Sequence, residues 1–298
     1  MATTIDALWR FPVKSMGGEQ LQEAVVTSAG IVGDRGYALI DKETGKVVSA
    51  KHPARWRGIL DCRATYVEEP RLGEPVPAVL IELPGGTSVH SDDAEVDRVL
   101  SEFFDREVTL SLPAGAYDTI DEYVPDDANL RPEGYRDELT ETRIGAAMFR
   151  HQGIPPMVPD ASFFDLMPIS VLTTASLARL AELAPGSVVD QRRFRMNLII
   201  AADDIGFIEN DWPGKALTIG AGTTLFGIIP TPRCVMTNLG QGDLPKDANI
   251  LRTTNLHNSR QVLEVGKYPC LGVYMVVAAE GAIRVGDSVV VTDPAVQQ

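Results

Sequence analysis

The sequence predicts a mostly β fold with a few helices, a β-rich α+β class, and three observations lead to it. Glycine (26 residues) and proline (20 residues) make up about 15% of the 298 residues, against an average of about 12%. This excess suits many short strands joined by turns. The apolar runs are short and bounded by turn residues. They do not alternate with helical patterns, which favours a closed or partly closed barrel over a parallel sheet.

The first third of the chain predicts a strand meander that ends in one helix. Its apolar runs are separated by turn-forming residues such as Gly30 and the pair Gly33–Asp34. The predicted strands are Ile5–Phe11, Leu21–Thr27, Tyr37–Asp41 and Val79–Leu83. Ser91 can cap a helix whose apolar positions recur at helical spacing. These positions are Val96, Val99, Leu100, Phe103 and Phe104. The helix closes a first domain, residues 1–115.

The remainder predicts a connecting segment and a second domain. Residues 116–160 carry scattered Pro, Asp, Glu and Gly with weak periodicity, so we place the connection here and the second domain at 161–298. In that domain Thr173 or Thr174 can cap a helix that ends at Pro185–Gly186. The predicted strands are Ile169–Leu172, Leu198–Ala201, Ala216–Ile219, Thr223–Ile229, Gly272–Val277 and Ser288–Thr292. Two domains agree with the length, since a domain usually holds roughly 100 to 200 residues.

Composition and charge exclude several classes of protein. Hydrophobic residues at 44% and charged residues at 23% are ordinary for a globular chain. The formal net charge of −14 repels phosphate backbones, so we expect no nucleic-acid partner. No apolar run approaches the roughly 20 residues that span a bilayer, and Met1 to Phe11 lacks the features of a secretory signal. We therefore expect a cytoplasmic protein with no membrane partner.

Several familiar catalytic and metal-binding patterns fail. Gly220-Ala221-Gly222 is followed by β-forming residues rather than a helix, so it predicts a hairpin turn and not a dinucleotide site. The four histidines share no short spacing, and no Cys-x-x-Cys pair exists to support a zinc site. The Gly-x-Ser-x-Gly turn of serine hydrolases is absent from the sequence.

One segment near the N-terminus suggests an anion site. Lys14 and Ser15 lie on a loop flanked by proline and glycine after a strand, where backbone amides can join them around an oxyanion. Arg35, in the run Gly33-Asp34-Arg35, can add a guanidinium. Such short motifs are more often solvated turns, so both interpretations stay open on these residues alone.

A second segment suggests a reactive or metal-binding thiol. Cys234 ends the run Pro230-Thr231-Pro232-Arg233-Cys234, in which two prolines stiffen the chain and Arg233 favours the ionised thiol that binds soft metals. A lone cysteine is more often inert packing, and we keep that interpretation for Cys62 and Cys270. Three widely spaced cysteines do not suggest a disulfide framework.

Taken together, five motifs in order along the chain resemble those of the MOSC family, named for the C-terminal domain of the molybdenum cofactor sulfurases. The motifs are Phe-Pro-Val-Lys-Ser-Met at 11–16, Gly-Asp-Arg-Gly-Tyr at 33–37, Phe-Arg-Met-Asn at 194–197, Pro-Arg-Cys at 232–234 and Gly281 to Val289. The pattern is most similar to the amidoxime-reducing members. The resemblance implies an N-terminal β-barrel-like MOSC domain at 1–115 and a MOSC-type β-barrel at 161–298.

The resemblance also implies a set of site residues. A cysteine at the position of Cys234 binds molybdenum directly, and the dithiolene of a pyranopterin supplies two further sulfurs. Lys14, Ser15 and Arg35 fall where the family holds the cofactor's phosphate. The residues implied beside the pterin or elsewhere around the cofactor are Arg195, Asn197, Arg233, Thr173, Thr174 and Ser176. Met196 stands where relatives often have proline.

The function implied is a molybdenum-pyranopterin (Mo-molybdopterin) enzyme that reduces N-hydroxylated or N-oxide substrates. Some bacterial relatives carry an appended ferredoxin with four closely spaced cysteines, which this sequence does not contain, so the electrons should come from a separate ferredoxin, flavin reductase or cytochrome. Asp165, Asp190 and Asp203 are candidate proton donors among which the sequence does not decide.

Two other functions are compatible with family membership. In a carrier that delivers sulfur or the cofactor to another enzyme, Cys234 would form a persulfide. Pyridoxal phosphate chemistry is a weaker alternative, because related sulfurases carry such a domain, but the sequence gives no context for a Schiff-base lysine.

Overall fold

A computed structural model describes residues 3–114, 117–124, 138–263 and 266–293. The strands are β1 (Thr4–Arg10), β2 (Glu19–Leu21), β3 (Glu23–Thr27), β4 (Gly30–Ile31), β5 (Ala38–Asp41), β6 (Arg63–Tyr66), β7 (Val79–Glu82), β8 (Ser88–His90), β9 (Val108–Ser111), β10 (Thr119–Val124), β11 (Glu138–Arg143), β12 (Ile169–Thr173), β13 (Leu198–Ala201), β14 (Ala216–Ile219), β15 (Thr223–Pro232), β16 (Ser259–Val262), β17 (Gly266–Ala279), β18 (Gly281–Arg284) and β19 (Val289–Thr292). The α-helices are α1 (Val96–Phe104), α2 (Gly145–His151), α3 (Thr174–Leu183) and α4 (Asn249–His257), and the 3₁₀ helices are η1 (Gln191–Phe194), η2 (Ile208–Asp211) and η3 (Val235–Asn238).

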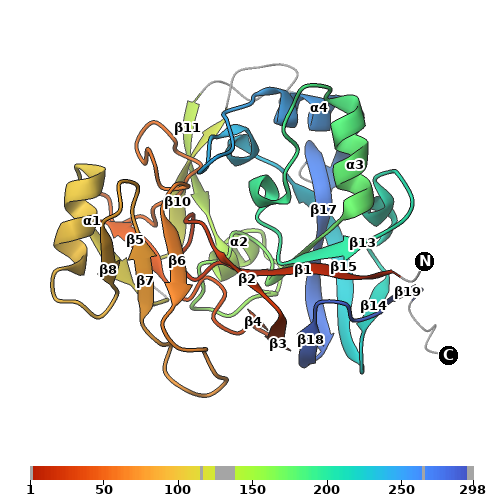
Figure 1. Cartoon of the computed structure of the whole chain (residues 1–298), viewed down its shortest axis with the longest axis horizontal. Coiled ribbons are helices and arrows are strands. Elements are labelled where there is room, and N and C mark those ends of the chain that lie inside the picture. The colour runs from red at the N-terminus through yellow and green to blue at the C-terminus, as the bar shows by residue number, and fades with distance from the viewer. Residues whose placement is uncertain (1–2, 115–116, 125–137, 264–265, 294–298) are drawn as a thin grey trace.

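The larger lobe, on the right of Figure 1, is a β-barrel. Its strands are hydrogen-bonded in the order β19-β14-β15-β17-β12-β13-β1, with β2 beyond β1 and β16 beside β17. The barrel closes where β1 meets the start of β19. There the amide of Val289 donates to the Thr3 carbonyl at 2.7 Å, and that of Ile5 donates to the Asp287 carbonyl at 2.9 Å. The predicted mostly β barrel fold is confirmed.

An apolar core fills the barrel because alternate residues of each strand point inward. Along β15 every second residue from Thr223 is buried, which is the pattern of a strand with one face in a core. The core residues come from both ends of the chain, including Ile5 of β1 and Val289 of β19. In addition β3 pairs with β18. Strands β1 and β3 are therefore hydrogen-bonded to strands of the second half of the chain, although the predicted boundary at residue 115 stays a prediction.

The smaller lobe holds the pairs β5–β9 and β6–β7–β8 together with α1 around a second core. Leu100 and Phe104 of α1 are buried in that core. The expected cap at Ser91 is wrong, because the helix begins five residues later and its N-cap is Glu95, which makes no side-chain cap hydrogen bond. Ser91 instead accepts a hydrogen bond from the Val79 amide at 2.9 Å.

Between and beside the lobes lie elements that the sequence pattern did not indicate. The predicted connecting segment holds the hairpin β10–β11 and the helix α2. Helix α4 and the three 3₁₀ helices were also not predicted. In contrast, α3 follows its predicted cap, since the Thr173 side chain accepts the Ser176 amide at 3.1 Å. The hairpin turn at Gly220–Gly222 is confirmed between β14 and β15.

The segment after β15 joins the two lobes. Strand β15 and η3 belong to the barrel lobe, but Met236 of η3 and the following Leu239 pack against the core of the smaller lobe. This contact places the turn at Cys234, which comes directly before η3, at the junction of the two lobes.

Candidate functional site

Five cationic side chains from distant segments gather at the junction of the two lobes. They are Lys14, Arg35, Lys51, Arg195 and Arg233, and we call them the basic cluster. Asp165 links Lys14 and Lys51 by ion pairs of 2.5 and 3.6 Å. The charge of Arg35 acts on Lys14, and the charges of Arg35 and Arg233 act on Arg195. The fold thus concentrates positive charge in a chain whose net charge is −14.

Lys14 is buried and directed into this junction. Its Nζ donates to the Phe163 carbonyl at 2.7 Å and to Asp165 Oδ1 at 2.5 Å. Burial lowers the pKa of Lys14, and Asp165 opposes that effect. Burial would raise the pKa of Asp165, but the charges of Lys14 and Lys51 outweigh it and hold this pKa well below the usual range. Asp165, which the sequence left unassigned as a proton donor, is therefore an anion that organises the two lysines.

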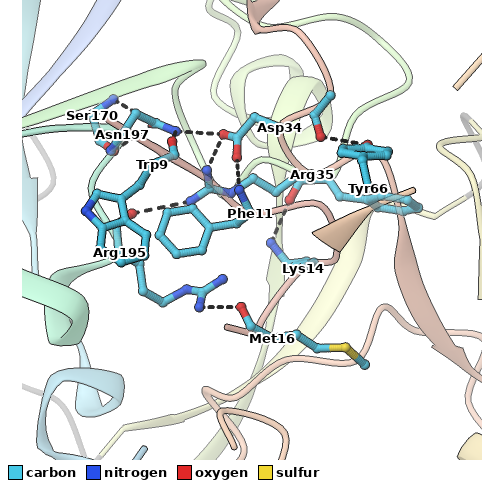
Figure 2. A network of polar contacts seen from close by, with 12 residues as sticks. Trp9, Phe11, Lys14, Met16, Asp34, Arg35, Tyr66, Ser170, Arg195 and Asn197 are labelled. Carbon is cyan, nitrogen blue, oxygen red and sulfur yellow. Dashed lines mark hydrogen bonds and ion pairs between the residues drawn. The ribbon is translucent and has the colours of Figure 1, made fainter. Parts of the chain in front are cut away.

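Asp34 is a buried carboxylate that connects three of the family motifs (Figure 2). Its Oδ1 accepts the Phe11 amide at 2.8 Å, and its Oδ2 accepts the side-chain amide of Asn197 at 2.9 Å and is paired with Arg35. The Asn197 carbonyl oxygen accepts from the amide and the hydroxyl of Ser170, at 3.1 and 2.9 Å. Both the carbonyl oxygen and the amide nitrogen of Asn197 are thus hydrogen-bonded within the protein, so its side chain positions Asp34 rather than offering groups to a ligand.

Arg195 lies over the ring of Phe11, 4.3 Å from its centroid, and donates to the Met16 carbonyl at 2.6 Å (Figure 2). Burial and the neighbouring charge of Arg35 lower the pKa of Arg195 to about 9. The charges of Asp34 and Asp165 oppose this effect but do not outweigh it, so the guanidinium charge is only partly compensated.

Backbone strain is concentrated at this site. Ser15, Arg35 and Arg195 have φ of 68°, 51° and 52°, which side chains other than glycine rarely adopt. Such conformations cost free energy and persist where the surrounding structure holds them, often at binding sites. All three were candidate site residues.

Cys234 is half-buried and precedes η3. Burial raises the pKa of its thiol, whereas Lys51, Arg233 and a hydrogen bond from the Met236 amide favour the thiolate. The other two cysteines, Cys62 and Cys270, are fully buried, and burial raises the pKa of each thiol to about 12. Neither can supply a thiolate at neutral pH.

Contacts with Phe194 and Met196 fix the orientation of the Arg233 guanidinium. Its Nη2 donates to the Phe194 carbonyl at 2.7 Å, and its Nη1 contacts the Met196 sulfur at 3.5 Å. Its Nε is buried and has no hydrogen-bond partner in the described residues. A buried donor without a partner is costly and indicates a ligand or solvent group that completes it.

The structure brings most, but not all, of the candidate residues together. Ser15 lies beside Lys14, and its hydroxyl accepts the Ala50 amide at 3.1 Å. Thr173 and Ser176 lie elsewhere, where both hydroxyls donate to the buried carboxylate of Glu209 at 2.8 and 2.6 Å. Thr174 exchanges hydrogen bonds with the backbone of Ala202. These three hydroxyls serve the start of α3 and do not point into the basic cluster.

Three residues at the lobe junction were not singled out in the sequence. Lys51 and Glu122 both act electrostatically on the Cys234 thiol. Tyr274 of β17 is affected by the charges of Asp165, Arg233, Lys51 and Arg35, and burial raises its pKa. None of the three belongs to a recognisable motif. Only the folded chain brings their segments to the site, so no signal in the sequence could identify them.

The residues present fit a phosphorylated cofactor with a soft metal. The cluster's five cations face three carboxylates (Asp34, Asp165 and Glu122), so an anion is needed to balance the excess positive charge. The depressed pKa of Arg195 and the unpartnered Nε of Arg233 indicate the same need. Cys234 supplies a sulfur ligand of the kind that soft metals prefer.

Comparisons with known families identify the family to which the chain belongs. Residues 2–59 match the MOSC N-terminal beta barrel domain, and residues 159–290 match the MOSC domain. The chain belongs to the MOSC family. Human mitochondrial amidoxime-reducing component 1 is 25% identical over 301 residues, covering 96% of this chain and 82% of that protein. Component 2 of Macaca fascicularis is also 25% identical, over 299 residues with the same coverage.

Two solved structures are similar to this MOSC protein. The YUAD protein from Bacillus subtilis has 10% sequence identity and a TM-score of 0.46, with 99% of this chain and 97% of that chain covered. YiiM from Geobacillus stearothermophilus has 16% identity and a TM-score of 0.30, with 44% and 57% covered.

The location of the protein is not established by these comparisons. Within the described residues, no helix combines the length and apolar character needed to cross a membrane. The curated relatives are mitochondrial by name. The cytoplasmic location therefore stays a prediction.

Proposed function

We propose that this chain is a molybdenum-cofactor-dependent reductase of N-hydroxylated or N-oxide compounds, with Cys234 as the protein ligand of the metal. The observation that carries the proposal is the position of the Cys234 thiol beside an uncompensated basic cluster at the junction of the lobes. The amidoxime-reducing relatives support the same class of reaction.

In this proposal four cations of the basic cluster bind two different parts of the cofactor. Lys14 and Arg35, with the Ser15 hydroxyl, hold the phosphate, since charge-assisted hydrogen bonds to phosphate are the strongest that side chains form. Arg195 and Arg233 lie beside the pterin and the metal. Asn197 and Asp34 hold Arg35 in place from behind through the buried hydrogen bonds described above.

When bound, the cofactor supplies the two-electron chemistry that reduces an N–O bond, with water as the second product. The protein binds the cofactor, leaves one side of Cys234 accessible and holds fixed charges around it. The lowered pKa of Asp165 makes this carboxyl a poor proton donor at neutral pH. The electrons come from a separate donor protein in this proposal.

Molybdenum and pterin analysis tests the proposal. Wild-type protein and a Cys62→Ala control should contain both, and both should reduce benzamidoxime with a chemical reductant. Cys234→Ser should retain much less molybdenum than wild type as purified and should lose the activity. Equal molybdenum in wild type and Cys234→Ser would contradict the assignment. A persulfide on Cys234, detected by mass spectrometry in a chain without molybdenum, would favour the sulfur carrier instead.

A further inference from the structure

Lys51 and Glu122 form a charged pair beside Cys234 that the cofactor assignment does not use. Lys51 lies on the loop after β5, and Glu122 lies on β10. Their backbones are tied together, because the Tyr123 amide donates to the Lys51 carbonyl at 2.8 Å. The Ala50 amide also donates to the Ser15 hydroxyl at 3.1 Å. The pair is thus anchored to the loop that carries Lys14.

The spacing of the pair leaves hydrogen-bonding capacity. Lys51 Nζ lies 3.6 Å from Glu122 Oε2 and 3.6 Å from Asp165 Oδ2, beyond the usual range of a direct hydrogen bond. Asp165 Oδ1 is already taken by Lys14 at 2.5 Å. The side chains of Lys51 and Glu122 are 13% and 19% exposed, so water or a ligand reaches them. The Lys51 ammonium, a donor, and the Glu122 carboxylate, an acceptor, therefore lie side by side with capacity for a further hydrogen bond.

The pair lies at the lobe junction close to Cys234, because Ala50, the neighbour of Lys51, belongs to the small-lobe core against which Met236 of η3 packs. This packing, together with the backbone bond between the two segments, places the pair on the smaller-lobe side of Cys234. Lys51 favours the thiolate form of Cys234, and Glu122 opposes it. A substrate that approaches a metal at Cys234 from this side would contact the Lys51 ammonium and the Glu122 carboxylate together.

We propose that Lys51 and Glu122 recognise the N–OH group of the substrate, with Lys51 donating to its oxygen and Glu122 accepting from its O–H. An N–OH group is an acceptor and a donor on one atom, which matches the pair. The inference rests on the proposed reductase function and narrows its substrate class. An N-oxide offers an acceptor oxygen without the O–H, so it can use Lys51 but not Glu122.

Steady-state kinetics on two substrates test this recognition. Glu122→Gln keeps an acceptor oxygen but loses the charge, so it should raise KM for benzamidoxime about fivefold and change KM for N,N-dimethylaniline N-oxide less than about twofold. Lys51→Met should raise KM for both substrates about tenfold, and Lys51→Arg should restore most of the loss. Lys46 and Glu141, an ion pair of 2.8 Å on the same hairpin region, give the control variants Lys46→Met and Glu141→Gln.

Thiol alkylation of cofactor-free protein provides a readout that needs no activity. The rate of Cys234 alkylation by anionic iodoacetate, divided by the rate with neutral iodoacetamide, reports the potential at the approach to the sulfur. This ratio should fall in Lys51→Met, rise in Glu122→Gln and stay unchanged in the two control variants.

The outcomes separate the two proposals. Absence of molybdenum and of reductase activity from the wild-type protein contradicts the proposed function, whatever the alkylation ratios. Alkylation ratios that do not change in Lys51→Met and Glu122→Gln overturn the inference about the pair, even in an active enzyme. Equal loss of both substrates in Glu122→Gln also overturns it, because an effect on packing does not distinguish N–OH from N-oxide.

Discussion

Arg35 and Arg195 illustrate how single residues are held for binding. Each has a positive φ, and the Arg35 Nη2 lies 3.5 Å from the Arg195 carbonyl. The two guanidinium groups both lie over the Phe11 ring, at 4.8 and 4.3 Å from its centroid. Two like charges on one aromatic ring repel each other, and the one carboxylate paired with them, Asp34 on Arg35, balances only one of the two. The two guanidinium groups therefore form a preorganised site for an anion.

Removal of the phosphate-binding cations should weaken cofactor retention. Lys14→Ala and Arg35→Ala each remove a charge-assisted contact of about 1.5 to 3 kcal/mol, so we expect cofactor affinity to fall at least about tenfold in each. Pterin content, measured by fluorescence after oxidative release, checks this. Lys46→Ala, which removes a cation that is paired outside the cluster, should keep the wild-type content. Undiminished pterin in both cluster variants would contradict the phosphate assignment.

Arg195 predicts a pH dependence of stability in cofactor-free protein. Its pKa falls from 12.5 to about 9 on folding, so the fold disfavours the protonated form. That penalty is complete below pH 9 and diminishes as the pH rises towards 12.5. Relative to Arg195→Met, the wild-type Tm should therefore increase between pH 7 and pH 10. A Tm difference that is independent of pH over this range would contradict an uncompensated charge at Arg195.

Among the elements, a short strand was predictable where it coincides with an apolar run bounded by turn residues, and polar strands such as β11 and β16 were missed. Strands β13 and β14 occupy the predicted residues, and β15 extends past its predicted end because Pro230 and Pro232 remain paired with β17. Helix α4, with the sequence Asn-Ile-Leu-Arg-Thr-Thr-Asn-Leu-His, was missed because Thr and Asn are poor helix formers. It forms because Ile250 and Leu251 are buried against other elements.

Glu209 connects three elements, and its loss should destabilise the fold. The buried carboxylate accepts from Thr173 and Ser176 at the start of α3 and from the Gly272 amide of β17 at 3.2 Å. Glu209→Ala leaves these buried donors unpaired, so we expect the free energy of unfolding to fall by about 3 kcal/mol or more. Urea denaturation checks this, with the exposed Glu182→Ala as a control that changes stability by less than about 0.5 kcal/mol.

The same carboxyl also predicts a pH effect. Burial raises the pKa of Glu209 above its ordinary value of 4.5. Its contribution to stability is therefore largest below pH 4.5 and declines as the pH rises through the folded pKa. Glu209→Gln should lack this decline. Parallel stability profiles for wild type and Glu209→Gln between pH 4 and pH 8 would contradict the assignment.

For the whole molecule, the decisive feature is that β1 closes the barrel of the second half of the chain. β1 lies between β13 and the start of β19, and its residues Ile5 and Leu8 are buried in the barrel core. A fragment of residues 161–298 leaves those two edges open and exposes the core. We expect it to show no cooperative unfolding transition, measured by circular dichroism. A cooperative transition in that fragment would show instead that the predicted division at 161 describes an independent domain.

The same long-range pairing explains what the sequence could and could not predict about the site. Lys14, Arg35 and Cys234 could be singled out as candidates because each belongs to a recognisable motif. Lys51 and Glu122 could not, because only the folded chain brings their segments to Cys234. The hydroxyls of α3 looked suitable as ligands, but Glu209, distant in sequence, engages two of them.

In the proposed enzyme, the Cys234 sulfur and four cations of the basic cluster hold one molybdenum cofactor between the two lobes. X-ray absorption spectroscopy at the molybdenum edge tests this arrangement most directly, with wild type and Cys234→Ser loaded with cofactor under the same conditions. We expect one sulfur neighbour fewer around molybdenum in Cys234→Ser. The same number of sulfur neighbours in both proteins would contradict it.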